Sequence, residues 1–184
     1  MTVQLDLKDI KGGELEQGYS CSLSEFPELG LLAAEGGPEF YEPLVFQLRF
    51  QRVGQIITAD GTLDATVKLR CGRCLDTFKH PLNESFSLAF TPAPESDIAA
   101  DEEEIELAGD ELNLIPYKDE VIELQDPLQE QLLMAVPINP VCELTCHGLC
   151  PLCGINLNCN SCDCVRKPFN NKFNILAGVD LKTS

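Results

Sequence analysis

The sequence predicts an α+β fold: an antiparallel β meander with one or two helices, and a cysteine-rich, zinc-binding C-terminal segment docked on it. Three observations support this fold class. Apolar and polar residues alternate over three runs between residues 44 and 90, which is the pattern of strands with one buried face. A stretch with leucines at helical spacing follows these runs. The chain has ten cysteines, which occur mostly in close pairs and mostly after residue 140.

Length and charge limit the classes of protein to consider. The chain has 184 residues and a formal net charge of −17. Nucleic-acid binders of one domain are usually basic, so RNA binding by the whole surface is disfavoured. The sequence shows no basic segment followed by an apolar run at its start, and no apolar stretch of the roughly 18 residues that span a bilayer. We therefore expect a cytoplasmic protein, where thiols stay reduced and clustered cysteines bind metal more often than they form disulfides.

The first two parts of the chain differ in regularity. Residues 1–43 are expected to be an irregular segment with one short strand, because Gly and Pro interrupt the pattern after VQLDL. Residues 44–90 are expected to form the antiparallel strand core with a CxxC turn. The alternation of the second run continues to Cys71, so RCGRC is the expected turn between the second and third strands. The alternating apolar residues are Leu44, Phe46, Leu48 and Phe50, then Leu63, Ala65, Val67 and Leu69, then Phe78, Leu82, Phe86, Leu88 and Phe90.

The rest of the chain divides into three parts. Residues 91–111 are expected to be an acidic loop or linker, with capture of a basic partner as the alternative. Residues 112–140 are expected to contain short strands at LNLIP and VIEL and then a helix, with Asp126 as its cap and Pro127 at its first position. Residues 141–184 are expected to be the cysteine-rich zinc segment with a basic tail. The apolar stripe expected to pack the helix against the sheet is Leu128, Leu132, Leu133 and Val136.

The spacing of the cysteines predicts one or two zinc ions as cofactor. Structural zinc takes four soft ligands in a tetrahedron, and two of them usually come from one tight CxxC turn. Four close pairs supply eight thiols, which is the number of ligands in two such sites. The predicted metal ligands are Cys71, Cys74, Cys142, Cys146, Cys150, Cys153, Cys162 and Cys164.

Spacing alone does not decide which pairs share an ion. We favour Cys71 and Cys74 with the pair 142/146, and the pair 150/153 with 162/164. The exchange, in which 150/153 joins the first pair, stays open. Cys21 is expected to be a buried free thiol. Cys159 is expected to be an exposed spare thiol, with replacement of Cys162 as a ligand as the alternative. With eight thiols available, His80 and His147 are expected to serve at the surface or in packing.

The sequence has two histidines, which do not suffice to argue a Ser, His and Asp catalytic constellation, and it has no phosphate-binding glycine motif. We therefore expect no enzyme. All-thiolate zinc sites are usually closed and structural. Thiol–disulfide exchange and a rubredoxin-like iron site are the redox alternatives. Basic residues flank the cysteines and form a candidate RNA- or partner-binding surface, or they offset the charge of the thiolates. These residues are Arg70, Arg73, Lys79, Arg166 and Lys167.

VKLRCGRCLDTF resembles the central signature of the YceD family of large ribosomal RNA subunit accumulation proteins. AVPINPVCELTCHGLCPLCGINLN followed by CDC is similar to the family's C-terminal cysteine region, and NKFNILAGVDLK is similar to its last stretch. This extended cysteine region resembles the versions found in cyanobacteria, Gram-positive bacteria and chloroplasts. Cys159 departs from the family pattern.

The resemblance implies a non-enzymatic role in the synthesis, processing or stability of 23S rRNA. The implied partner is the large-subunit ribosomal precursor, its rRNA or a maturation factor, with no membrane and no small-molecule substrate. The implied location is the cytoplasm, or the plastid stroma for an organellar mature form. A protein–protein adaptor without RNA contact is the alternative function.

Overall fold

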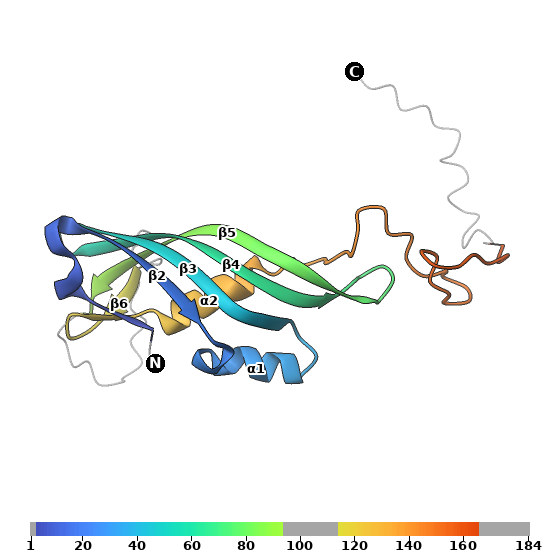
Figure 1. Ribbon diagram of the computed structural model, residues 1–184, viewed down its shortest axis with the longest axis horizontal. Coiled ribbons are helices and arrows are strands. Elements are labelled where there is room, and N and C mark those ends of the chain that lie inside the picture. Colours follow the sequence, from blue (N-terminus) through green and yellow to red (C-terminus); the bar gives the residue numbers. More distant parts are fainter. Residues whose placement is uncertain (1–2, 94–113, 166–184) are drawn as a thin grey trace, which may run out of the picture.

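The computed structural model describes residues 3–93 and 114–165. Its main element is a five-stranded sheet in the order β2-β3-β4-β5-β6, and helices α1 and α2 lie against it (Figure 1). Strands β2 to β5 are antiparallel neighbours, and β6 runs parallel to β5. The α+β class is therefore confirmed. The strands are β2 (Glu14–Cys21), β3 (Glu39–Val53), β4 (Ile56–Arg70), β5 (Thr77–Pro92) and β6 (Leu114–Tyr117).

The three alternating runs of the sequence are strands β3, β4 and β5. Their even-parity positions on β3 and odd-parity positions on β4 share one face, because Phe46 pairs with Leu63 and Phe50 with Ala59. These four side chains are buried in the main hydrophobic core. Strand β3 begins earlier than expected, since Phe40 is buried on the same face beyond an irregularity of the ladder between Tyr41 and Val45. Pro43 fits there because the interrupted ladder does not need its missing N–H.

The N-terminal part of the chain is more regular than the prediction of an irregular segment. Strand β2 pairs with β3 along its whole length, and α1 (Pro27–Ala34) buries Leu29 in the core. The expected short strand at VQLDL is β1 (Gln4–Asp6), which pairs with β7 (Val121–Glu123). Three short 3-10 helices complete this part: η1 (Leu7–Asp9), η2 (Lys11–Gly13) and η3 (Leu23–Glu25).

Helix α2 (Gln125–Ala135) closes the core on the same side of the sheet as α1. It begins earlier than predicted, after Leu124, and Asp126 makes no capping hydrogen bond. Pro127 still lies in the first turn, where a missing N–H costs nothing. Leu128 and Leu132 are fully buried, and Leu133 and Val136 pack on the same core, which confirms the predicted packing of this stripe against the sheet.

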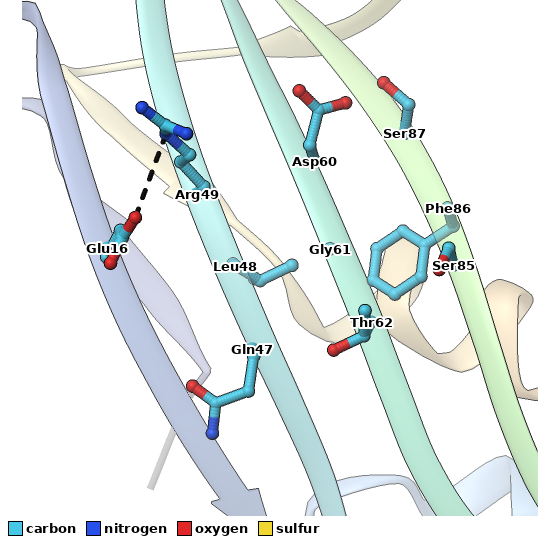
Figure 2. A pocket seen from close by; sticks show the side chains of 10 residues that line it. All are labelled: Glu16, Gln47, Leu48, Arg49, Asp60, Gly61, Thr62, Ser85, Phe86 and Ser87. Atoms are coloured by element: carbon cyan, nitrogen blue, oxygen red, sulfur yellow. Dashed lines mark ion pairs between the residues drawn. The ribbon is translucent and has the colours of Figure 1, made fainter.

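The opposite face of the sheet is polar and carries an open hollow of about 640 Å³ (Figure 2). Side chains of Gln47, Arg49, Asp60 and Ser87 line it, and Arg49 forms an ion pair with Glu16. Among the described residues, the clusters of side chains that could hold a metal ion consist of cysteines, and none of these cysteines lines this hollow. We therefore place the candidate site elsewhere.

Two predictions fall on parts that the structure covers little or not at all. Most of the acidic segment 91–111, and the basic tail from residue 166 onward, lie outside the described residues. No helix among the residues described has the length and apolar character to cross a membrane.

Candidate metal centres

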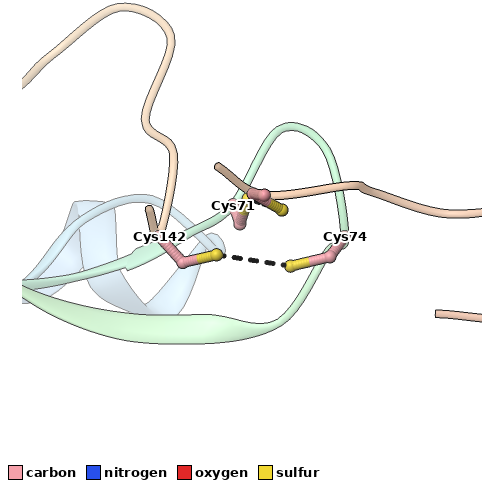
Figure 3. Close-up of side chains that lie close together, drawn as sticks. Cys71, Cys74 and Cys142 are labelled. Atoms are coloured by element: carbon pink, nitrogen blue, oxygen red, sulfur yellow. Dashed lines mark hydrogen bonds between the residues drawn. The ribbon is translucent and has the colours of Figure 1, made fainter. Parts of the chain in front are cut away.

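The turn between β4 and β5 supplies the first half of a four-cysteine group, defined here as site 1. Cys71 directly follows the last residue of β4, and Cys74 ends the same turn. Cys142, which Figure 3 shows beside Cys71 and Cys74, and Cys146 come from the segment that follows α2. The four sulfurs all lie within 4.8 Å of one another. Antiparallel pairing of β4 with β5 thus creates the turn, and the path of the chain after α2 brings the other two cysteines to it.

The sulfur geometry of site 1 fits a tetrahedral ion. The Sγ atoms of Cys74 and Cys142 are 3.7 Å apart, and those of Cys71 and Cys146 are 3.9 Å apart. Zn–S bonds of about 2.3 Å in a tetrahedron place the sulfurs about 3.8 Å from each other. Three of the four cysteines are buried, and Phe78 and Val141 pack against them. This is the arrangement of a closed structural site, and the donor set suits zinc as well as iron.

A second four-cysteine group, site 2, lies further along the chain. Its members are Cys150, Cys153, Cys162 and Cys164, whose sulfurs also lie within 4.8 Å of one another. Cys150 is buried, whereas Cys153 and Cys164 are exposed. All four cysteines of site 2 thus come from one short segment, residues 150–164. In Figure 1 this segment extends past the end of the sheet that carries the β4–β5 turn.

The structure brings together the two sets of cysteines that the sequence analysis favoured, and not the exchanged sets. Cys159 is an exposed free thiol and Cys21 a buried one. His80 and His147 belong to neither group.

The CxxC turns of the two sites have the same backbone geometry. In site 1 the N–H of Leu75 donates to the carbonyl of Cys71 at 3.0 Å, and in site 2 the N–H of Gly154 donates to that of Cys150 at 2.9 Å. The residue after each second cysteine is left-handed, with φ of 64° at Leu75 and 74° at Gly154. This turn directs backbone N–H groups toward the first sulfur of each pair.

Those N–H groups change the acidity of the first thiol in each turn. Hydrogen bonding from the backbone of Cys74, outweighing burial, lowers the pKa of Cys71 to about 6. The backbone of Cys153 has the same effect on Cys150, whose pKa also falls to about 6. The balance is reversed in Cys164. Neighbouring thiols, with Cys153 first and burial added, raise the pKa of Cys164 to about 12. Backbone N–H groups thus stabilise the thiolate of the first cysteine in each turn, whereas neighbouring thiols disfavour the thiolate of Cys164.

Backbone contacts dock the cysteine segment on the end of the sheet. The N–H of Gly72 donates to the carbonyl of Pro140 at 2.8 Å, and that of Leu149 donates to Arg73 at 3.1 Å. The guanidinium of Arg73 donates through Nη1 to the carbonyls of Leu144 and Cys146, both at 3.1 Å. The predicted docking of this segment is confirmed.

The predicted basic surface is described only in part. Arg70 donates from Nε to the carbonyl of Leu75, and Lys79 lies 4.5 Å from the centre of the Tyr41 ring. With Arg73 holding the ligand loop, all three have a contact within the chain, although all three are exposed. Arg166 and Lys167 lie outside the described residues.

Two asparagines near the sites were not identified from the sequence. Asn156 donates from Nδ2 to the carboxylate of Asp76 at 2.6 Å, which links the loop of site 2 to the start of β5. Asn158 donates from Nδ2 to the sulfur of Cys146 at 3.3 Å. Asn is common in loops, so its type and spacing carried no signal for this role.

The part of the chain that contains both cysteine groups is similar in sequence to known proteins. The family model described as "Large ribosomal RNA subunit accumulation protein YceD" matches residues 59–180. An uncharacterized protein of Mycobacterium tuberculosis is 32% identical over 115 residues, which are 62% of this chain and 51% of that protein. The chloroplastic large ribosomal RNA subunit accumulation protein YCED homolog 1 of Arabidopsis thaliana is 28% identical over 127 residues, 59% of this chain and 39% of the relative. The Zea mays protein of that name is 27% identical over 130 residues, 60% and 44% of the two chains.

The matched regions therefore span about half of these curated relatives or less. No solved structure matches the chain. The range matched by the family model includes both groups of four cysteines.

Proposed function

Because the chain belongs to the YceD family of large ribosomal RNA subunit accumulation proteins, we propose that it is a non-enzymatic factor that supports the synthesis, processing or stability of 23S rRNA. In this proposal it acts on the large-subunit precursor, its rRNA or a maturation factor, in the cytoplasm or in the plastid stroma. Sites 1 and 2 each hold one structural zinc. The observation that carries the proposal is the family match across both cysteine groups.

Zinc has a structural and not a catalytic role in this proposal. Each site offers four thiolates and no histidine or carboxylate, and such sites leave no open position for substrate. Bound at site 1, an ion would join the β4–β5 turn, through Cys71 and Cys74, to the segment after α2, through Cys142 and Cys146. Bound at site 2, it would close the loop from Cys150 to Cys164.

Metal content tests the zinc sites first. Protein purified under reducing conditions should contain about two zinc ions per chain and show no visible colour, because zinc has no d–d transitions. Replacing Cys142 and Cys146 by Ser should leave about one. A coloured, iron-containing protein would instead support the rubredoxin-like alternative, and a metal-free one would leave thiol chemistry.

The ratio of 23S to 16S rRNA tests the cellular function. Depletion of the protein in its own organism should lower this ratio, and the unaltered chain should restore it. The chain with Cys142→Ser and Cys146→Ser should fail to restore it if site 1 is needed. An unchanged ratio on depletion would reject the proposed function.

Co-sedimentation with large-subunit precursors tests the basic surface. Arg73 is unsuitable for this test because it holds the ligand loop. We therefore choose Lys79→Glu with Arg166→Glu, which should abolish co-sedimentation. Lys8→Glu with Lys11→Glu is the control of equal charge, since both lysines lie in 3-10 helices of the N-terminal part. Retained binding of the first pair would remove this surface from consideration. If deletion of residues 95–111 then abolished binding, the protein–protein adaptor would be favoured.

A further inference from the structure

We propose that Asn158 couples the two metal sites, by carrying a hydrogen bond from the loop closed by site 2 to a ligand sulfur of site 1. This inference rests on the zinc sites proposed above. Through this one side chain, an ion bound at one site would raise the metal affinity of the other site.

By its position along the chain, Asn158 belongs to the loop of site 2. It lies between Cys153 and Cys162, which are two ligands of site 2. Its amide Nδ2, however, is 3.3 Å from the sulfur of Cys146, which is a ligand of site 1. A loop whose ends would be held by one ion thus supplies a donor to the ligand of the other ion.

The orientation of the amide is fixed by a second contact. The backbone N–H of His147 lies 2.7 Å from Oδ1 of Asn158. A backbone N–H can only donate, so the atom facing it must be the amide oxygen. The nitrogen is then directed to the sulfur of Cys146. The backbone N–H of Asn158 also donates to Oδ1 of Asn156 at 3.0 Å, which sets the local turn.

The loop itself is tied to its surroundings by the residues just before Asn158. The N–H of Leu157 donates to the carbonyl of Gly148 at 2.9 Å, and the N–H of Cys150 to that of Ile155 at 2.8 Å. Asn156 reaches Asp76 beside the first CxxC turn. These contacts hold the loop of site 2 at the rim of site 1, so Asn158 needs no rearrangement to reach the sulfur.

A donor to a ligand sulfur has two effects on a metal site. It stabilises the negative charge of the thiolate, and it orients the ligand; loss of such a partner typically costs 10- to 100-fold in metal affinity. The contacts named above all lie before Asn158, so the loop after it is held through the ligands Cys162 and Cys164. With site 2 empty this constraint is lost, and the donor is less well placed. An ion in site 2 should therefore strengthen site 1, and by linkage an ion in site 1 should strengthen site 2 by the same factor.

Zinc release from the full-length, metal-loaded chain tests the coupling. Transfer of zinc to a chromogenic chelator should be about tenfold faster from site 1 in Asn158→Ala than in the unaltered chain. Asn158→Asp is a second variant of nearly the same shape. It keeps an oxygen for the N–H of His147 but replaces the donor to sulfur by an acceptor, so release should be at least as fast. Asn160→Ala is the control in the same loop, since the structure gives only the backbone of Asn160 a hydrogen bond there.

Removal of site 2 supplies the second half of the cycle. Cys162→Ser with Cys164→Ser should speed release from site 1, and adding Asn158→Ala to this chain should change the rate little further. Additive effects of the two changes would overturn the proposal, because independent contributions do not pass through Asn158.

Cadmium NMR separates the two sites spectroscopically. In the cadmium-loaded chain each site should give one ¹¹³Cd resonance, assigned by the Cys→Ser pairs. Asn158→Ala should move the site 1 resonance and leave that of site 2 nearly unchanged. Two bound ions with unchanged resonances and release rates would overturn the coupling alone. A chain that binds no ion would overturn the proposed zinc sites as well.

Discussion

At the scale of single residues, the two CxxC turns adopt the same left-handed conformation with different residues. Both turns need a left-handed residue after the second cysteine, and this conformation costs an ordinary L-residue roughly 1–2 kcal/mol. Gly154 adopts it with φ of 74°, whereas site 1 has Leu75 at φ of 64°. The same turn thus forms with or without glycine, at a different cost.

Gly154→Ala should weaken site 2 by about tenfold, because the added Cβ meets open space and only the left-handed conformation is penalised. Competition with a chelator of known affinity measures this change. Gly72→Ala is the matched control in the other CxxC turn. Gly72 is not left-handed, and its added Cβ would be 3.6 Å from the carbonyl oxygen of Pro140, an ordinary contact. Equal effects of the two substitutions would contradict the argument.

Cys21 gives a pH dependence at the other end of the chain. Burial, helped by Glu25, raises the pKa of this thiol from 9.0 to about 11. The unfolded chain therefore loses this proton at lower pH than the folded one. The contribution to stability is complete below pH 9 and is lost as the pH rises from 9 to 11.

Cys21→Ala should remove this part of the alkaline destabilisation. At pH 11 the free energy of unfolding should have fallen by about 2–3 kcal/mol less in the variant than in the unaltered chain. Urea unfolding of the zinc-loaded proteins between pH 8 and 11 measures it. Parallel pH profiles would show that Cys21 does not titrate in this way. Burial first, and then the charge of Cys21, raise the pKa of Tyr19 to about 12, so its titration lies above the range in which Cys21 loses its proton.

At the scale of elements, the sequence predicted the long strands and also the short ones at VQLDL, LNLIP and VIEL, which are β1, β6 and β7, but it missed β2. Strands β3 to β5 keep a period of two over many residues, so their pairing followed from the pattern. Strand β2 was missed because Gln17 interrupts its apolar face, while Leu15 and Tyr19 are only half-buried at the sheet edge. Hydrogen bonding to β3 along its whole length stabilises β2 as a strand, although its own sequence has no regular apolar alternation.

One glycine in the sheet core is fixed by its neighbours across both flanking strands. Gly61 pairs with Leu48 on β3 and with Phe86 on β5. An added Cβ would clash with the side chain of Leu48 and lie 2.9 Å from Cζ of Phe86. The sheet accommodates Phe86 at this position because Gly61 has no side chain.

Gly61→Ala should therefore destabilise the protein by about 1–3 kcal/mol, the usual cost of overpacking. Thermal or urea unfolding measures the change. Gly18→Ala on β2 is the control, since its added Cβ would meet only the end of the flexible Gln47 side chain. A variant of Gly61 as stable as that of Gly18 would mean that Leu48 and Phe86 can move apart freely.

At the scale of the whole molecule, spacing singled out eight candidate ligands and favoured the grouping that the structure brings together, but it left the exchange of pairs open. Cys71 and Cys146 meet across 75 positions of sequence, and Cys74 and Cys142 across 68. Only the path of the chain through β5, β6 and α2 brings them together. Asn158 is invisible to sequence reasoning for the same reason, because its sulfur acceptor belongs to the other site.

The separation of two cores decides what metal removal should do. The main core, formed by the sheet and both helices, contains none of the eight ligands, and Cys71, Cys74 and Cys146 form a separate small cluster. Structural zinc contributes about 10–16 kcal/mol of apparent binding energy in small peptides, which is comparable to the whole stability of a domain. Apart from the hydrogen bonds of Arg73, Gly72 and Leu149, the small cluster has few apolar contacts to hold it, whereas the main core has its own buried apolar side chains.

Removal of zinc by a chelator at neutral pH, under reducing conditions, should therefore unfold residues 141–165 and leave the five-stranded sheet folded. Hydrogen exchange should show lost protection in the cysteine segment and retained protection in β3 and β4. The chain with Cys159→Ser is the control for a thiol outside both groups, and it should respond to the chelator as the unaltered chain does. Loss of protection throughout the sheet would mean that the ions stabilise both cores together. Unchanged protection in residues 141–165 would mean that the hydrogen bonds of Arg73, Gly72 and Leu149 hold this segment without metal.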